Sequence, residues 1–182
     1  MILPLAFAGN PILYKKCKDI PVKDIDSAKV QTFLNDLGET VTKYKNAAGF
    51  AAPQLGKTWN VFCLELDKRS MNYDVLSPKT FEIPPNKPFF FINPTLEFPN
   101  GLTDEMGEGC LSIPYYIVYV DRYLTAKVSA YTREGIYFEI LAKGLFARYI
   151  QHEVDHLHGI LMFQRAKKTE DIVFNFDASE KE

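Results

Sequence analysis

The sequence predicts an α+β fold with mixed, largely antiparallel sheets packed around a C-terminal helix, and with another helix near the N-terminus. A helical pattern comes first, several segments with strand patterns follow, and a second helical pattern comes after them. This order is typical of α+β domains rather than of alternating β-α-β units. The 182 residues suffice for one domain with a real core, so we expect a single domain over residues 1–182.

The first elements are an N-terminal arm and a helix. Residues 1–9 are apolar but too few to cross a membrane, so we expect a buried arm. Asp26 and Ser27 are capping residues, apolar residues recur after them at helical spacing, and Gly49 follows. The spaced residues are Val30, Phe33, Leu34, Leu37, Val41 and Tyr44.

Strand patterns fill the middle of the chain. Residues 59–66 and 89–98 are rich in aromatic and β-branched residues, and the polar stretch 67–88 between them predicts a long surface loop. Residues 116–131 alternate, and a turn then leads into residues 136–141, which predicts a hairpin. One face of the alternating run holds Leu124, Ala126, Val128 and Ala130.

The helical period returns after Gly144, and Gly159 is placed to cap this second helix. The tail from Lys167 is charged, and we expect it to fray. The helix residues expected to face the core are Leu145, Tyr149, Ile150, Val154 and Leu157.

Composition excludes several classes of protein. A net charge of −2 provides no basic field for nucleic acid, and 47% hydrophobic with 24% charged residues is ordinary for a soluble globular protein. We therefore expect no specific nucleic-acid partner and no membrane. Three cysteines are an odd number, which favours reduced thiols and a cytoplasmic location. Cys17 and Cys63 are expected to be small buried hydrophobic residues.

The second predicted helix carries a pattern typical of metal binding. His152 and His156 are four residues apart, so they share one helix face, and Glu153 is next to the first of them. Alone, this pattern also fits two core or solvated histidines. Cys110 offers a third ligand, and three protein ligands with one open position are typical of catalytic sites.

A metalloprotease is a competing interpretation of the same helix. One protease signature continues with a glycine and a third histidine, but Met162 stands where that histidine is needed. His158 is only two residues beyond His156, which turns it to another face of the helix.

Three segments, in this order, resemble the peptide deformylase family. They are GFAAPQ at residues 49–54, EGCLS at 108–112 and QHEVDHLHG at 151–159, and weaker similarity extends from about Pro11 to about Arg165. The resemblance implies a metal-dependent hydrolase that removes the formyl group from the N-terminal formylmethionine of new proteins. Its partners would be an N-formylmethionyl peptide or nascent chain, with transient ribosome contact. The divalent ion would be Fe²⁺ in the cell, and Zn²⁺, Ni²⁺ or Co²⁺ suit the same ligands.

The resemblance also implies residue roles. Cys110, His152 and His156 would hold the metal, and Glu153 would move a proton from the attacking water to the leaving amine. The Gln54 side chain and the Leu111 backbone N–H would stabilise the oxyanion. The residues that would contact substrate are Gly49, through its backbone, together with Ala48, Met106, Gly109, Leu145 and Tyr149. For Gly49 a helix cap is an alternative, and for Gln54 a buried amide bonded to backbone.

Other residues near these motifs carry looser expectations. Glu108 and Arg122 could pair with each other, and Asp155 could orient a ligand histidine or be a plain surface carboxylate.

The chain departs from the family pattern in four places. Ala47 replaces a glycine, which would penalise a positive φ, and Tyr115 stands where many members have glycine. Tyr149 is bulky for a methionine pocket and predicts a narrower one. Residues 67–88 look like an insertion. Ala47 and Tyr115 leave one rival open, a non-catalytic metal-binding or peptide-binding relative. A second rival is an endopeptidase that uses the same metal-bound hydroxide.

Overall fold

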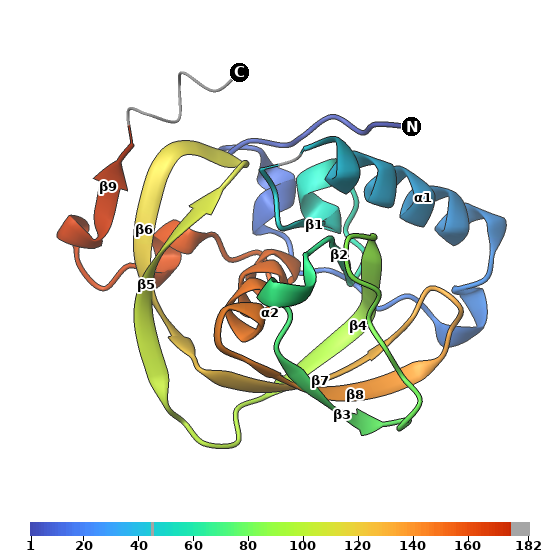
Figure 1. The fold of residues 1–182 in the computed structure, drawn as a ribbon. Coiled ribbons are helices and arrows are strands. Elements are labelled where there is room, and N and C mark those ends of the chain that lie inside the picture. Colours follow the sequence, from blue (N-terminus) through green and yellow to red (C-terminus); the bar gives the residue numbers. More distant parts are fainter. Residues whose placement is uncertain (45, 176–182) are drawn as a thin grey trace.

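The computed structural model describes residues 1–44 and 46–175. Over these residues the fold consists of two antiparallel sheets and two α-helices, joined by short 3-10 helices, with the C-terminal α-helix at the centre (Figure 1). One sheet has the strand order β1-β2-β4-β7-β8-β3 and the other β5-β6-β9, and the predicted α+β class is confirmed. The strands are β1 Gly49–Ala51, β2 Val61–Leu64, β3 Tyr73–Ser77, β4 Phe89–Glu97, β5 Thr103–Cys110, β6 Ile113–Tyr123, β7 Thr125–Tyr131, β8 Tyr137–Lys143 and β9 Ile172–Phe174.

Helix α1, Ala28–Lys43, confirms the first helical prediction. The Ser27 Oγ accepts a hydrogen bond from the Val30 N–H, which satisfies a donor that the first turn leaves unpaired. Five of the six spaced apolar residues are buried, and they pack against β1, β2 and β4. Burying each such side chain contributes about 1.5–3 kcal/mol, so this apolar face and not intrinsic propensity holds the helix. Tyr44 is the C-cap residue.

Helix α2, Gly144–Leu157, contacts strands of both sheets. Gly159 has a φ of +74° just past its end, which confirms the predicted glycine cap. Ile150, Val154 and Leu157 are buried as expected. The expectation for Leu145 is wrong, because 40% of this residue is exposed. The buried face of the first turn instead contains Phe146 and Ala147.

Residues 67–88 are not simply a surface loop. Strand β3 pairs with β8 and forms an edge of the six-stranded sheet. After it, Phe81 stacks on Phe138 with ring centroids 4.3 Å apart, and Ile83 is buried. The segment therefore extends the sheet and covers the core, and its five-residue strand was too short to be recognised from alternation.

The alternating run 116–131 is divided between the two sheets. Strand β6 belongs to the small sheet and β7 to the large one, with the break at Leu124, which is 37% exposed. Ala126, Val128 and Ala130 are buried, and β7 and β8 form the predicted hairpin. The alternation of apolar and polar residues continues across Leu124 because side chains in both strands alternate with a period of two. The sequence pattern therefore does not reveal that the chain passes from one sheet to the other there.

The two ends of the chain differ from expectation. The N-terminal arm is largely exposed: Met1 is 72% and Phe7 54% exposed, and only Ala6 of residues 1–9 is buried. The tail is ordered further than expected, since β9 pairs with β6 through residue 174. Residues 176–182, the rest of the predicted frayed tail, lie outside the described residues.

Gly49 gives a test of packing in the large sheet. A Cβ atom at this position would lie 2.3 Å from the backbone oxygen of Cys63 in β2, and backbone cannot move aside easily. We expect Gly49→Ala to lower the free energy of unfolding by about 2–3 kcal/mol, as measured by urea titration. Gly109→Ala is the matched control, because its Cβ would meet only the Ile117 Cδ1 at 3.5 Å. Equal losses in the two variants would contradict this explanation.

Candidate metal centre

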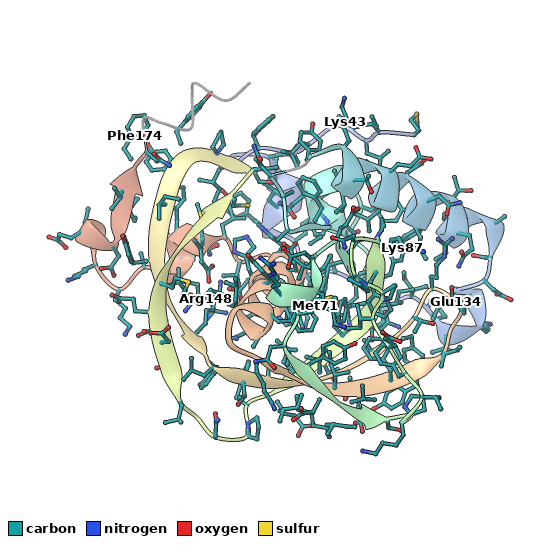
Figure 2. The ribbon with its side chains drawn as sticks, in the orientation of Figure 1. Lys43, Met71, Lys87, Glu134, Arg148 and Phe174 are labelled. Atoms are coloured by element: carbon teal, nitrogen blue, oxygen red, sulfur yellow. The ribbon has the colours of Figure 1, made fainter. Side chains whose placement is uncertain are left out.

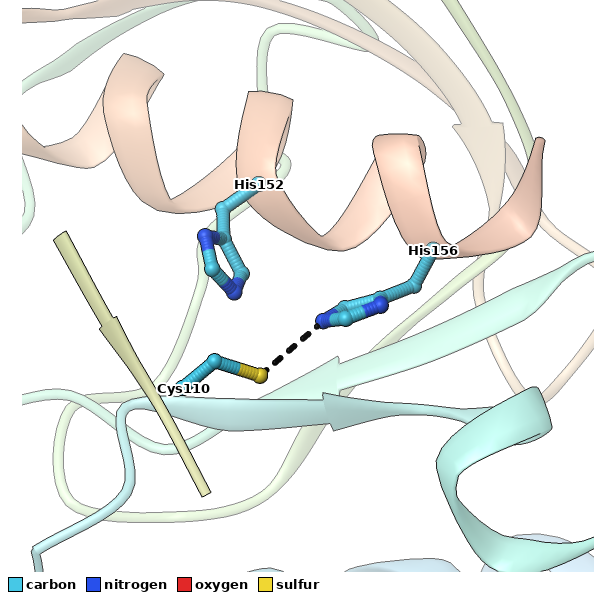
Figure 3. A group of neighbouring side chains, drawn as sticks. All are labelled: Cys110, His152 and His156. Atoms are coloured by element: carbon cyan, nitrogen blue, oxygen red, sulfur yellow. Dashed lines mark hydrogen bonds between the residues drawn. The ribbon is translucent and has the colours of Figure 1, made fainter. Parts of the chain in front are cut away.

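Three side chains that can ligate a metal meet between α2 and the end of β5. Cys110 is the last residue of β5, and His152 and His156 project from successive turns of α2 toward it (Figure 3). One ligand atom from each of the three residues lies within 4.8 Å of the other two. The Cys110 Sγ lies 3.3 Å from the His156 Nε2.

This donor set fits a single divalent ion. Bonds of about 2.0–2.3 Å in a tetrahedral site put ligand atoms about 3.5 Å apart, and the ligand atoms here lie within 4.8 Å of one another. One thiolate and two imidazoles suit Fe²⁺, Zn²⁺, Ni²⁺ and Co²⁺ alike. The three residues fill three positions and leave a fourth for a small molecule.

The burial of His156 keeps its ring in the form that binds metal. Only 1% of the residue is exposed, and burial lowers the pKa of its imidazole well below the ordinary value. The ring is therefore neutral near pH 7 and retains a nitrogen lone pair. Among the described residues its Nδ1 has no hydrogen-bond partner.

Glu108 orients His152. Its Oε2 accepts from the His152 Nδ1 at 2.9 Å, which leaves Nε2 as the nitrogen that can ligate a metal. Burial alone would lower the pKa of His152, but its hydrogen bonds with Cys110 and Glu108 raise that pKa well above the ordinary value, so a metal that binds Nε2 would displace a proton. Burial alone would raise the pKa of the Glu108 carboxyl, but hydrogen bonds from His152 and Arg122 lower it to about 2. Glu108 is therefore a permanent anion beside the site.

A buried ion network extends from Glu108. Arg122 donates from Nε and Nη2 to the two Glu108 oxygens, each at 2.9 Å, so the pair expected from the sequence is bidentate. Arg122 also donates to Asp155, which accepts from Arg165 as well. Asp155 is 5% exposed, which rules out a plain surface carboxylate. Among the described residues the side-chain partners of Asp155 are arginines rather than a ligand histidine, so any effect of Asp155 on the site passes through Arg122.

Glu153 combines burial with an unpaired oxygen. The residue is 5% exposed, and among the described residues its Oε2 has no hydrogen-bond partner. Burial raises the pKa of its carboxyl to about 7. A buried polar atom without a partner is rare outside functional sites. A carboxyl with a pKa near neutrality can both take up and release a proton.

Gln54 lies at the thiolate end of the site. Its Oε1 accepts from the Ala51 N–H at 2.8 Å, while its Nε2 donates to the Ser112 Oγ at 3.1 Å and lies 3.6 Å from the Cys110 Sγ. The amide is thus both bonded to backbone and directed toward the site. Leu111, the residue after Cys110, is partly buried against the cluster under α1.

The expected substrate residues do not all come together. Met106 and Leu145 line a cavity of about 110 Å³ and are 43% and 40% exposed. Ala48 and Tyr149 lie outside this lining and pack partly buried against the main core. The other residues of the lining are Asp104, Arg122, Tyr123, Leu124, Gly144 and Arg148.

Two strand edges border the centre. Gly49 begins β1, an edge of the large sheet, and Gly109 lies on β5, an edge of the small one. Gly49 also lies well beyond the C-cap of α1 at Tyr44, so it does not cap that helix. Edge strands have backbone groups free to pair with an added strand.

The two backbone departures from the family pattern have different outcomes. Tyr115 has a φ of +70°, a conformation that explains why glycine suits this position. The other non-glycine residues with positive φ in the described part of the chain are Asn86 and Asn93. Ala47 therefore has an ordinary φ, and the expected backbone penalty at that position is absent.

The structure does not support the metalloprotease alternative. Met162 is 2% exposed and packs in a hydrophobic cluster, so it provides no ligand, and His158 points to solvent.

Two further residues near the centre were not singled out from the sequence. Ser112 accepts a hydrogen bond from Gln54, and Arg148 donates to Glu108 at 2.9 Å. The signal available for Arg148 was an arginine one turn before His152, on the same helix face as His152 and Asp155.

The family model and the curated relatives that match this chain are all named as deformylases. A family model described as polypeptide deformylase matches residues 2–171. The peptide deformylase of Dictyoglomus turgidum is 36% identical over 167 residues, which cover 91% of this chain and 94% of that protein. Peptide deformylase 1A of Arabidopsis thaliana is 32% identical over 158 residues, or 85% of this chain. The match spans only 57% of the plant protein.

A solved structure has the same fold. The peptide deformylase of Acinetobacter baumannii, crystallised with Met-Ala-Ser bound, superposes with a TM-score of 0.74 at 29% identity and covers 91% of this chain and 99% of that one.

Neither helix of the described chain, residues 1–44 and 46–175, has the length and hydrophobicity needed to cross a bilayer.

The buried Glu108 predicts a pH dependence of stability. Its folded pKa of about 2 lies below the usual 4.5, so its stabilising effect is complete above pH 4.5 and is lost as the pH falls toward 2. We expect Glu108→Gln to lower the free energy of unfolding by about 3 kcal/mol at neutral pH, because two arginines lose their anion. The difference from the wild type should shrink below pH 4.5 in urea titrations with a chelator present. A difference that stays constant down to pH 3 would contradict the assignment.

Proposed function

The chain belongs to the polypeptide deformylase family, and on that premise we propose that it removes the formyl group from the N-terminal formylmethionine of newly made proteins. One observation carries the proposal beyond family membership. The ligand atoms of Cys110, His152 and His156 lie within 4.8 Å of one another, and the next residue along the helix from His152, Glu153, is buried with an oxygen that has no hydrogen-bond partner among the described residues. Those groups are what water-driven cleavage of an amide requires.

The proposed cofactor is one divalent ion held by Cys110, His152 and His156. When bound, the ion acidifies water and polarises the formyl carbonyl. The single thiolate leaves a dication with a net positive charge, which favours both effects. We propose Fe²⁺ as the ion used in the cell, and purified protein can carry Zn²⁺, Ni²⁺ or Co²⁺ instead.

Glu153 is the proposed proton carrier. Its carboxylate takes a proton from the attacking water while the oxygen adds to the formyl carbon. It then gives the proton to the amide nitrogen as the carbon–nitrogen bond breaks, which releases formate and a free amino terminus. An amide nitrogen leaves poorly unless it is protonated, so one carboxyl with a pKa near 7 serves both steps.

Gln54 and Leu111 are the proposed oxyanion donors. The Gln54 amide is held on one side by the Ala51 N–H and on the other by Ser112, which limits its rotation. Donors that are fixed before the reaction lose little energy to reorganisation when charge develops on the carbonyl oxygen. The Leu111 N–H follows Cys110 directly and would approach the same oxygen.

The proposed substrate site lies between the β1 and β5 edges. Gly49 would pair with the peptide backbone as an added strand, and Gly109 would border the opposite side. The pocket for the methionine side chain is proposed to use Met106 and Leu145, both apolar and exposed, with Ala48 and Tyr149 at its inner border. The Met-Ala-Ser bound to the Acinetobacter relative supports a peptide ligand.

The proposed substrate also suggests where the protein acts. Formylmethionine begins new chains, so we propose a nascent chain as substrate, transient contact with the ribosome and a cytoplasmic location. The three cysteines are free, in agreement with a reducing compartment.

Deformylation of formyl-Met-Ala-Ser tests the proposal directly. We expect activity after reconstitution with Fe²⁺ or Ni²⁺, and a kcat about 10²–10⁴ lower for Glu153→Ala, because the proton transfer is lost. Metal content measured on the same samples should be unchanged, since Glu153 is not a proposed ligand. Peptides with only internal amide bonds should not be cleaved. A wild type no faster than the variant would overturn the proposal.

The bulk of Tyr149 predicts a restricted pocket. We expect a narrower pocket to reduce the preference for methionine and norleucine over alanine as the first residue of formyl peptides, and Tyr149→Ala to raise kcat/KM for larger first residues such as phenylalanine. One methylene in an apolar pocket is worth about 1–3 kcal/mol, so the change should be at least about tenfold. If the variant kept the wild-type ranking, Tyr149 would not border the pocket.

A further inference from the structure

Arg148 is a buried cation that the proposed reaction does not use. It lies one turn before His152 on α2, and 5% of it is exposed. A guanidinium in such a place is costly unless its donors are paired. Figure 2 labels it beside α2, on the side of the β5–β6 hairpin.

The bonds of Arg148 join three elements. Its Nη1 donates to the Glu108 Oε1 at 2.9 Å and to the Val120 backbone oxygen at 2.8 Å, and its Nη2 donates to the Asp104 backbone oxygen at 2.6 Å. Asp104 and Glu108 belong to β5, and Val120 to β6. One side chain therefore ties α2 to both strands, and the strand held at two points is the one that ends in Cys110.

Glu108 is held on both of its oxygens. Oε1 accepts from Arg148 and from the Arg122 Nε, while Oε2 accepts from the Arg122 Nη2 and faces the His152 Nδ1. Arg122 comes from β6 and also bonds to Asp155. Arg148 lies on the same helix as His152. The Glu108 carboxylate is therefore bonded to α2 through Arg148 as well as through the imidazole that the carboxylate orients.

We infer that Arg148 is a positioning residue of the metal centre. Through Glu108 it fixes the His152 ring, and through β5 it sets how far Cys110 lies from α2. In the described part of the chain, the Arg148 guanidinium donates to Glu108, Val120 and Asp104 and to no ligand side chain, so any effect on the metal passes through these two routes. The inference rests on the proposed function only in that the centre holds a divalent ion.

Metal affinity tests the inference without relying on turnover. The full-length protein is stripped with a chelator, and the Zn²⁺ Kd is measured by competition with an indicator. The absorption of bound Co²⁺ then reports its bond to the Cys110 thiolate. We expect Arg148→Met to raise the Zn²⁺ Kd about 10–100-fold, the usual effect of losing a residue that supports a ligand, and to weaken the cobalt–thiolate absorption.

Two further variants separate positioning from general stability. Arg165→Met is the matched control, because Arg165 belongs to the same ion network through Asp155 but its side chain is 43% exposed. It should change the Kd by less than about threefold, as expected for a mostly exposed pair. Arg148→Lys keeps the charge without the planar fork and should lie between the wild type and Arg148→Met. If Arg148→Met does not fold, the lysine variant carries the test.

A double-mutant cycle identifies the route. In a Glu108→Gln background, Arg148→Met should add much less to the Kd than it does alone if Arg148 acts through Glu108. An unchanged Zn²⁺ Kd in Arg148→Met, or in Arg148→Lys if only that variant folds, would overturn the inference even with lowered thermal stability. Failure of the wild type to bind Zn²⁺ at all would overturn the proposed function as well, so the two failures can be told apart.

Discussion

The rest of the site depends on the buried ion pairs and hydrogen bonds of the Glu108 carboxylate. Moving an ion of this size from water to the protein interior costs several kcal/mol even after relaxation. Here two guanidinium groups and one imidazole, from β6 and α2, offset that cost. The charges are compensated only when β5, β6 and α2 are together, so the energetics of the core and the geometry of the metal centre are linked through one carboxyl group.

The two sheets position the reactive groups from opposite sides. The small sheet brings Cys110 and Glu108, while the large sheet brings Gln54 through the short turn after β1. Helix α2 lies between them and supplies the histidines and Glu153. Gly49 shows how tight this arrangement is, because the backbone of β2 occupies the space of a Cβ atom there. The resemblance explains Gly49 by its contact with a substrate. The structure shows that close packing against β2 also requires glycine at this position.

The sequence predicts those features that depend on residues close together in the chain. Helix α1 follows from its cap and apolar spacing, and the metal ligands follow from the helical spacing of two histidines and a separate cysteine motif. Strand β5 was missed because TDEMGEGC has no alternation and is polar and rich in glycine; its structure comes from pairing with β6. Arg148 was missed for a similar reason, since its partners lie 28 to 44 residues away. Exposure of Leu145 and Leu124 likewise depends on contacts that neighbouring residues do not reveal.

The position of β3 has a consequence for how this chain can vary. Strands β1 and β3 form opposite edges of the six-stranded sheet, with four strands between them. The segment of residues 67–88 therefore places a strand at the edge away from β1, and Phe81 of this segment packs on Phe138. A longer connection after β3 would leave the backbone edge of β1 free to pair with an added strand. The same border is therefore a suitable place for an inserted peptide or a reporter domain, because four strands separate it from β1.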